Sequence, residues 1–330
     1  DFTGLDLTGA DLTGVDLTSA DLTGAILTAV TSGSIVGIPT LPSGYQIIGG
    51  YLIGPGVDLR SSDLAGADLT GADLTGADLR HSNLTGADLT NADLSGANLR
   101  STNLSNADLT NANLNNINPA LINLSGVILT GVKSGDIINY DNPSFLPTLP
   151  SGYQIIDGYL IGPGVDLTGA DLTEADLTGV TSGSIVGTPT LPSGILLEGG
   201  YLIGPGVDLT GVDLTGLDLS GADLIGATLT SADLTGAILT GLTSGSISGI
   251  PTLPSGTLLV AGYLIGPGVD LRSSDLAGAD LTGANLTGAD LRVSNLTGAD
   301  LTNADLSGAN LRETDLTGAD LTNANLYNIN

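Results

Sequence analysis

The stretch ADLTGADLTGADLR at residues 67–80 determines how this chain folds. It is built from five-residue units that read Ala, then Asp or Asn, then Leu, Thr and Gly, as in 67–71 and 72–76. A Gly in every fifth position and a β-branched Thr beside Asp oppose a helix, whereas Asp-Leu-Thr alternates outward, inward and outward as a short strand does. We therefore expect short extended segments joined by corners, at which Gly, or Asn at positions such as Asn91, has a positive φ.

This pattern continues outside four inserts over roughly two thirds of the chain, and its central residue is almost always Leu. It resembles the pentapeptide-repeat family, whose motif is a small residue, Asp or Asn, Leu or Phe, a small polar residue or Arg, and then often Gly. The resemblance implies an all-β fold, a right-handed quadrilateral β-helix with four pentapeptides per coil, in which the central Leu and the preceding small residue point inward. Leu side chains stacked about 4.8 Å apart would then form the core.

The arginines support four pentapeptides per turn independently of that resemblance. Six of the seven basic residues recur in two groups at steps of 20 residues, namely Arg60, Arg80 and Arg100, then Arg272, Arg292 and Arg312. Four pentapeptides per turn place each group in one vertical row, whereas a three-sided coil gives no reason for the spacing. Where His81, Val293 or Glu313 follows an arginine, a left-handed corner would be strained, so we expect a different type of turn there.

Four inserts interrupt the repeat, at residues 31–58, 133–166, 181–208 and 243–270, and all of them end in YLIGPGVDL. Each contains PTLPSG and then two short apolar runs around a two-residue turn such as Gly49-Gly50 or Asp157-Gly158. These turn residues favour type I′ geometry, so each insert is predicted to form a β-hairpin. Eight of the ten aromatic residues lie in the inserts: Tyr45, Tyr51, Tyr140, Phe145, Tyr153, Tyr159, Tyr201 and Tyr263.

The number of pentapeptides between inserts indicates where the hairpins lie. It is 16, 4 and 8, which are whole numbers of four-sided coils, so we expect every insert to leave the coil at the same corner. On the last coil before an insert, Ile replaces the outward Asp or Asn at Ile26, Ile128 and Ile238, whereas the one-coil block has Asp176 there. We expect each insert to fold back over this isoleucine and bury it.

A longer repeat is superimposed on these, because residues 1–118 align without gaps with residues 213–330 at an offset of 212, and about five positions in six are identical. We expect one continuous β-solenoid over residues 1–330, made of a unit at 1–212 and a partial second copy at 213–330. The chain starts and stops within the pattern, without the capping element that solenoids need for solubility. We therefore expect further units in the parent protein, or copies that stack end to end.

Composition narrows the classes of function. The 330 residues include no Cys, one His, and 35 acidic against 7 basic residues. Thiol catalysis, disulfides and cysteine-ligated metals are excluded, and a formal net charge of -28 argues against binding to nucleic-acid phosphates. Every apolar stretch is broken well before the roughly 18 residues of a membrane-spanning helix. The sequence contains no catalytic triad, phosphate loop or histidine cluster, so we expect no enzyme activity, no cofactor, no nucleic-acid partner and no membrane insertion.

Charged residues form rows with two interpretations each. Aspartates recur at 20-residue steps, as in Asp68, Asp88, Asp108, Asp280, Asp300 and Asp320. Carboxylates about 5 Å apart repel by roughly 1 to 3 kcal/mol at effective dielectric constants of about 20 to 80. The rows are either a solvated face that keeps the protein soluble or sites of weak, distributed calcium binding. The arginine rows either neutralise aspartates on their own surface or dock against the acidic face of a neighbouring molecule.

These observations favour a noncatalytic structural protein, a subunit or segment of an extracellular or cell-surface fibre that self-associates end to end and laterally. The interface candidates are the six arginines of the two rows, the isoleucines Ile26, Ile128 and Ile238, and the hairpin tyrosines Tyr51, Tyr159, Tyr201 and Tyr263. The resemblance implies an alternative, because some pentapeptide-repeat proteins mimic DNA and bind a type II topoisomerase. The acidic charge fits that role, whereas the apolar inserts and arginine rows do not. Ice binding is a lesser alternative, since it requires outward Thr-x-Thr arrays and the pair across Leu is Asp and Thr.

Overall fold

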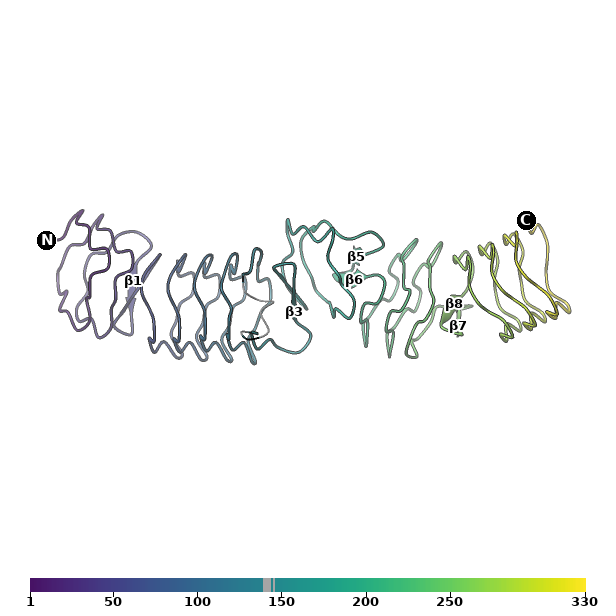
Figure 1. The fold of residues 1–330 in the computed structure, drawn as a ribbon, viewed down its shortest axis with the longest axis horizontal. Coiled ribbons are helices and arrows are strands. Elements are labelled where there is room, and N and C mark those ends of the chain that lie inside the picture. The colour runs from purple at the N-terminus through teal and green to yellow at the C-terminus, as the bar shows by residue number, and fades with distance from the viewer. Residues whose placement is uncertain (139–143, 145) are drawn as a thin grey trace. The chain divides into compact units, whose positions relative to one another are not determined.

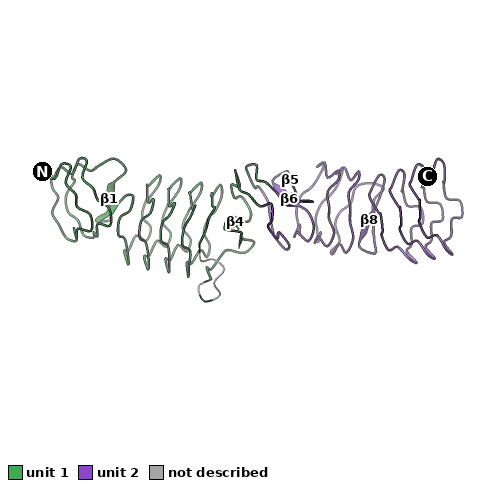
Figure 2. Ribbon diagram, turned by 45° about the horizontal axis from the view of Figure 1, so that its top comes forward, with its two compact units in different colours: residues 1–172, 185–190 green, residues 173–184, 191–330 purple. Residues whose placement is uncertain are grey.

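The computed structural model describes residues 1–138, 144 and 146–330, so Tyr140 and Phe145 lie outside the described residues. The chain forms two compact units (Figure 2). Unit 1 comprises residues 1–172 and 185–190, and unit 2 comprises residues 173–184 and 191–330. Among the described residues, regular strands occur in four short pairs, and the coil itself is held by isolated parallel bridges. None of these residues belongs to a helix of the length and apolarity that crossing a bilayer requires.

Residues 58–132 of unit 1 show the regular coil, whose successive turns lie side by side (Figure 1). Bridges join residues 20 positions apart in four rows, so each turn has four sides of five residues. The central Leu of the pentapeptides is buried, and so is the Ala two residues before it at most positions, such as Ala72 and Ala87. The predicted all-β, quadrilateral β-helix is thereby confirmed. We name the sides after their rows: face 1 contains Asp58, Asp78 and Asn98; face 2, Asp63, Asn83 and Asn103; face 3, Asp68, Asp88 and Asp108; face 4, Asp73, Asp93 and Asn113.

The corner residues between faces have a left-handed backbone conformation, with positive φ. At Gly71, φ is +66° and an added Cβ would meet nothing within 4 Å, so conformation rather than space favours glycine there. His81, Val293 and Glu313 have φ values of +60°, +61° and +64°, so our expectation of a different turn after arginine is wrong. The stacked turns impose one corner geometry, because the His81 amide donates to the Arg100 carbonyl just as the Gly71 amide donates to Thr90. These bonds offset the roughly 1 to 2 kcal/mol that a left-handed conformation costs a residue with a Cβ.

Each insert is one enlarged turn of the coil that carries a hairpin. In the first insert, Thr31, Val36 and Thr40 still bridge to the preceding turn, and the hairpin then takes the place of the fourth side. Both turn residues of every hairpin have positive φ, so the predicted type I′ turns are confirmed. The antiparallel pairs are β1 (Gln46–Ile48) with β2 (Tyr51–Ile53), β3 (Gln154–Ile156) with β4 (Tyr159–Ile161), β5 (Leu196–Glu198) with β6 (Tyr201–Ile203), and β7 (Leu258–Val260) with β8 (Tyr263–Ile265).

A serine marks the place where each hairpin enters the core. Ser32 directly follows Thr31 and occupies the position of a central Leu, and its buried Oγ accepts a hydrogen bond from the Leu52 amide at 2.8 Å. Because the Leu52 side chain is fully buried, the hairpin supplies the apolar group that the serine lacks. The same bond joins Leu160 to Ser134, Leu202 to Ser182 and Leu264 to Ser244. The hairpins are therefore part of the hydrophobic core.

The two inserts of each unit leave the coil from adjacent faces, so our expectation of a common corner is wrong. Each insert returns to the face that it left, and in unit 1 these are face 1 and face 4. The second insert departs at Ser134, which is the centre of the last of the 16 pentapeptides that begin with the one centred on Leu59. Ser134 therefore lies only 15 pentapeptide steps after Leu59. Fifteen steps end one face short of complete turns. The closing bridges are Thr31 to Asp58, Lys133 to Asp166, Thr181 to Asp208 and Thr243 to Asp270.

Candidate interaction surfaces

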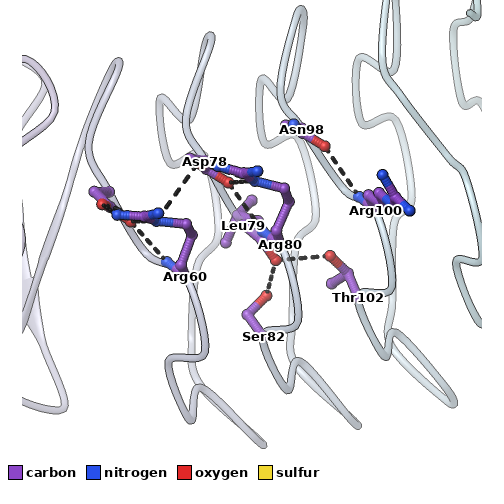
Figure 3. Close-up of polar contacts among 9 residues, drawn as sticks. Arg60, Asp78, Leu79, Arg80, Ser82, Asn98, Arg100 and Thr102 are labelled. Atoms are coloured by element: carbon purple, nitrogen blue, oxygen red, sulfur yellow. Dashed lines mark hydrogen bonds and ion pairs between the residues drawn. The ribbon is translucent and has the colours of Figure 1, made fainter.

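The arginines of unit 1 lie in one row on face 1 (Figure 3). The Arg80 guanidinium donates from Nε to Asp78 Oδ1 at 2.8 Å and from Nη2 to Oδ2 at 2.6 Å, and Arg60 makes the same bidentate pair with Asp58. Arg60 Nε also lies 3.7 Å from Asp78 Oδ2, which links two turns. The hydrogen bond from Arg60 is the main cause that lowers the pKa of Asp58. Arg60 and Arg80 thus each have the carboxylate of their own pentapeptide as a counterion.

The third arginine of each row has different surroundings. Asn98 stands where aspartates stand in the two turns before it, and its Oδ1 accepts the Arg100 amide at 3.3 Å. Arg312 likewise follows Asn310, and its Nε lies 3.5 Å from Glu313 Oε1. In unit 2, Arg272 and Arg292 form bidentate pairs with Asp270 and Asp290. Four of the six arginines therefore neutralise aspartates on the protein's own surface, and docking of the arginine rows on a neighbouring molecule stays a prediction.

Small polar side chains lie inside the coil behind the arginines. Ser82 and Thr102 donate hydrogen bonds to the Leu79 carbonyl at 2.6 and 2.8 Å (Figure 3). Ser294 and Thr314 donate to the Leu291 carbonyl in the same way. Ser62 and Ser274, at the first turn of each row, are buried, and their hydroxyls have no hydrogen-bond partner among the described residues. The arginine face therefore differs from the other faces on its inner as well as its outer side.

The carboxylates of the aspartate row on face 3 accept hydrogen bonds within their own pentapeptides. In Asp68, Asp88 and Asp108, and in Asp280, Asp300 and Asp320 of unit 2, Oδ1 accepts the amide of the threonine two residues later at 2.9 to 3.1 Å. The Thr90 hydroxyl and amide lower the pKa of Asp88, and Thr302 does the same to Asp300. Among the described residues, no three His, Cys, Asp or Glu side chains gather as a metal-binding group. Calcium binding stays a prediction.

Hairpin tyrosines connect the first, second and fourth inserts to the turn that follows each of them. Tyr51 Oη accepts the Asp63 amide at 3.2 Å, and the tyrosine ring lies against Gly33, where an added Cβ would be 3.3 Å away. Tyr159 and Tyr263 accept the amides of Asp171 and Asp275 in the same way. Tyr201 packs on Gly183, but among the described residues no backbone amide donates a corresponding bond to its hydroxyl. These contacts give the tyrosines a bracing role, and their role as interface residues stays a prediction.

The isoleucines before the inserts remain half exposed, so our expectation that the hairpins bury them is wrong. Ile26, Ile128 and Ile238 each keep 49% of their surface accessible. The cause is that the buried leucine of each hairpin, such as Leu52, draws the hairpin into the coil instead of outward over the isoleucine. Asp176, at the equivalent position of the one-coil block, is exposed as well, so the expected difference in burial between that block and the others is not observed.

Sequence reasoning missed an apolar surface at the outer edge of the hairpins. Ile38 and Ile250, at equivalent positions of the first and fourth inserts, are 91% and 86% exposed. A hollow of about 430 Å³ lies beside Ile38 and is lined by Pro39, Leu41 and Ile47 among others. The signal for this surface is present in the sequence, since residues 31–57 and 243–269 contain no charged side chain at all. An uncharged stretch of this length stands out in a chain with 35 acidic residues.

Comparisons with known proteins place these features in context. The family model described as pentapeptide repeats matches in eight copies, over residues 1–30, 56–91, 77–116, 87–131, 163–181, 206–241, 267–292 and 294–330. Among solved structures, HetL, a pentapeptide repeat protein involved in heterocyst differentiation regulation in the cyanobacterium Nostoc, is 26% identical over 99% of this chain and 89% of its own, with a TM-score of 0.21.

Two further solved structures illustrate the range of similarity. A pentapeptide repeat protein of the Arabidopsis thaliana thylakoid lumen is 27% identical over 43% of this chain and 72% of its own, with a TM-score of 0.18. Trypsin-treated QnrB1, a plasmid-mediated fluoroquinolone resistance protein, is 14% identical over 80% of this chain and 88% of its own, with a TM-score of 0.23. None of the curated proteins matches the chain.

Proposed function

Because this chain belongs to the pentapeptide-repeat family, we propose that its right-handed quadrilateral β-helix serves as a noncatalytic structural element, a segment of an extracellular or cell-surface fibre. The fold alone does not determine this role, since one fold can serve unrelated activities. The observation that carries the proposal is the recurrence of the surface of residues 1–118 at an offset of 212 residues.

The recurrence extends to the side-chain contacts. The Arg60–Asp58 pair returns as Arg272–Asp270, the Tyr51 bond to the Asp63 amide returns as Tyr263 to Asp275, and the Ser32 anchor returns as Ser244. A catalytic or ligand-binding function needs one constellation in one place. An assembly needs the same contacts at regular intervals, which is what a tandem unit provides. Repetition of a whole surface therefore supports a structural role.

The charge distribution supports the same proposal. The aspartate rows face outward and hold their carboxylates in hydrogen bonds to following threonines, as Asp88 does with Thr90. A net charge of -28 keeps large assemblies dispersed and prevents nonspecific collapse. Self-association must then occur through defined surfaces at which this repulsion is avoided.

Electron microscopy of the purified 330-residue chain, together with sedimentation velocity over a concentration series, tests the proposal. We expect elongated assemblies whose mass increases with protein concentration. Monodisperse single chains at every concentration and ionic strength would contradict it. A gyrase supercoiling assay addresses the DNA-mimic alternative, and we expect no effect of the chain because apolar inserts and arginine pairs interrupt its acidic surface.

A further inference from the structure

We propose that the outer strands of the first and fourth hairpins, β1 and β7, are the contact surfaces at which a second copy of this chain docks, edge to edge. The inference rests on the proposed assembly function and specifies both its surface and its partner. It follows from three independent features of these hairpins: the direction of their backbone groups, their exposed apolar side chains and their lack of charge.

The direction of the Leu52 amide shows which backbone groups are available. This amide donates to Ser32 Oγ and so points away from β1, which makes Ile47 and Leu52 a non-hydrogen-bonded pair of the hairpin. The N–H and C=O of Ile47 therefore point to the outer edge of β1. By the same argument, the Leu264 amide bonds to Ser244 and leaves the Leu259 groups on the outer edge of β7.

The outer edges of these strands are open to another strand. Each hairpin sheet has only two strands in the described part of the chain, so no other strand pairs with β1 or β7 on its outer side. Proteins usually protect such an edge with charged residues, proline or a covering segment. The strands here read Gln-Ile-Ile and Leu-Leu-Val and have none of these protective residues.

Exposed aliphatic side chains border the same edge. Ile38 lies beside Gln46 and Ile47 around the hollow described above and is 91% exposed. Ile250 is 86% exposed, and Leu258 of β7 is also exposed. Removing such side chains from water contributes about 25 cal/mol for each Å² of apolar surface buried, which is the driving force that an edge-to-edge contact needs.

Charge identifies the partner as a second copy. Acidic rows on two approaching chains repel each other, whereas residues 31–57 and 243–269 bring no charge into a contact. An antiparallel edge is also self-complementary, because Ile47 of one copy can pair with Ile47 of the other around a two-fold axis. The remaining hairpins differ in this respect, since β5 ends in Glu198 and the turn after β3 begins with Asp157.

The salt dependence distinguishes this contact from docking of arginine rows on aspartate rows. Between about 0.1 M and about 1 M sodium chloride, the screening length falls from about 10 Å to about 3 Å. Apolar edges on two acidic chains should associate more tightly as salt screens their repulsion. Ion pairs between arginine and aspartate rows should weaken over the same range.

The test compares two double variants of the full chain by sedimentation velocity at both salt concentrations. Ile38→Asp with Ile250→Asp places a carboxylate on each edge, and we expect at least about tenfold weaker association because a carboxylate is costly to bury. Ile26→Asp with Ile238→Asp adds the same charge at the half-exposed isoleucines of the pentapeptide faces, which are the rival interface candidates. If the hairpin edges make the contact, this variant associates like the unmodified chain. Hydrogen exchange of residues 46–48 should slow on assembly, while the Leu52 amide stays protected throughout.

The outcomes separate this inference from the proposed function. Unchanged association of the Ile38→Asp, Ile250→Asp variant, or association that weakens with salt, would overturn the docking surface and leave the assembly function standing. Equal loss in both double variants would also overturn it, because added charge alone would then account for the effect. Failure of the unmodified chain to associate at either salt concentration would overturn the assembly function itself.

Discussion

The regular coil at residues 58–132 and the enlarged turn at residues 31–57 are stabilised in different ways. Within the regular coil, backbone bonds join consecutive turns on every face, as from Leu64 to Asn83 and from Gly66 to Thr85. Between the enlarged turn and the next one, backbone bonds occur near face 1, from Asp78 to Val57 and from Gly56 to Thr75. On face 2, the Asp63 amide is bonded to the Tyr51 hydroxyl instead.

This difference shows what each region requires of its sequence. The coil is held by a backbone ladder, which any outward side chain leaves intact, so Asp, Asn, Thr and Ile all occur on its faces. The enlarged turn depends on particular side chains: Ser32 receives an amide, Leu52 fills the core, and Tyr51 replaces a backbone acceptor. We therefore expect the inserts to be sensitive at few positions and the coil to be sensitive mainly at its leucines.

Leu52→Ala and Leu84→Ala test whether the hairpin contributes to the core as the coil does. Both side chains are fully buried, so each substitution should reduce the free energy of unfolding by about 2 to 5 kcal/mol. Chemical denaturation combined with hydrogen exchange measures the loss and locates it. If Leu52→Ala were nearly neutral while Leu84→Ala was costly, the hairpin would be an accessory to the coil and our comparison would fail.

Gly37→Ala and Gly71→Ala separate a steric requirement from a conformational one. An added Cβ at Gly37 would lie 2.4 Å from the Thr18 amide nitrogen, with φ at +95°, whereas Gly71 has open space around it. We expect Gly71→Ala to cost about 1 to 2 kcal/mol and Gly37→Ala at least about 3 kcal/mol, since backbone must move there. Melting temperatures of the two variants provide the comparison, and equal values would argue against the close approach.

Tyr51→Phe removes the hydroxyl that accepts the Asp63 amide while preserving the ring on Gly33. The expected loss is about 1 kcal/mol, confined to the seam between the insert and the following turn. Faster hydrogen exchange at the Asp63 amide would report it. Tyr201→Phe is the matched control, because the described residues show no corresponding bond there, and a similar loss in both variants would contradict the bracing role of the Tyr51 hydroxyl.

Acid should weaken the coil and spare the hairpins of the first and fourth inserts. The pKa values of Asp88 and Asp300 lie below the ordinary value because threonine hydroxyls and amides donate to the ionised carboxylates. Such groups stabilise the fold above the unfolded pKa of about 3.9, and this contribution is lost as pH falls through the lower, folded pKa.

Thermal melting between about pH 5 and about pH 2 measures this effect, with stability expected to fall across that range. The variant Asp88→Asn with Asp300→Asn keeps an acceptor oxygen that does not titrate, so it should lose slightly less stability than the unmodified chain. Protection from hydrogen exchange should decrease least in residues 46–53, where no carboxylate is present. Greater acid sensitivity in the hairpins than in the coil would contradict the assignment.

Much of the fold could be predicted from the sequence because a five-residue period and 20-residue steps between arginines specify the winding of the coil directly. The hairpins were equally predictable from turn pairs such as Gly49-Gly50. The conformation of His81 was not, because single-residue preferences oppose it and only the stacked turns enforce it. The face on which an insert lies depends on every pentapeptide before it, so a difference of one step, 15 instead of 16 between Leu59 and Ser134, moves the second insert to the adjacent face.

The candidate surfaces were less predictable than the fold. The sequence pattern predicts neither that the Leu52 side chain is buried in the core nor that Ile26 therefore stays exposed, because both depend on how the hairpin packs against the coil. The bidentate pairs of Arg60 and Arg80 could be anticipated from the Asp two residues earlier in each pentapeptide. The outward groups of Ile47 required knowledge of which hairpin amide Ser32 receives.

The return of each insert to the face from which it left has a consequence for how such chains diversify. Adding or deleting a single pentapeptide between two inserts would re-aim the second hairpin by a quarter turn while preserving the internal anchors of both. The number of repeats between hairpins therefore determines the direction in which the second hairpin points, independently of the residues of the hairpin itself. Slippage in a repetitive gene could change the direction in which a protein of this kind reaches its neighbours, without altering any residue that makes the contact.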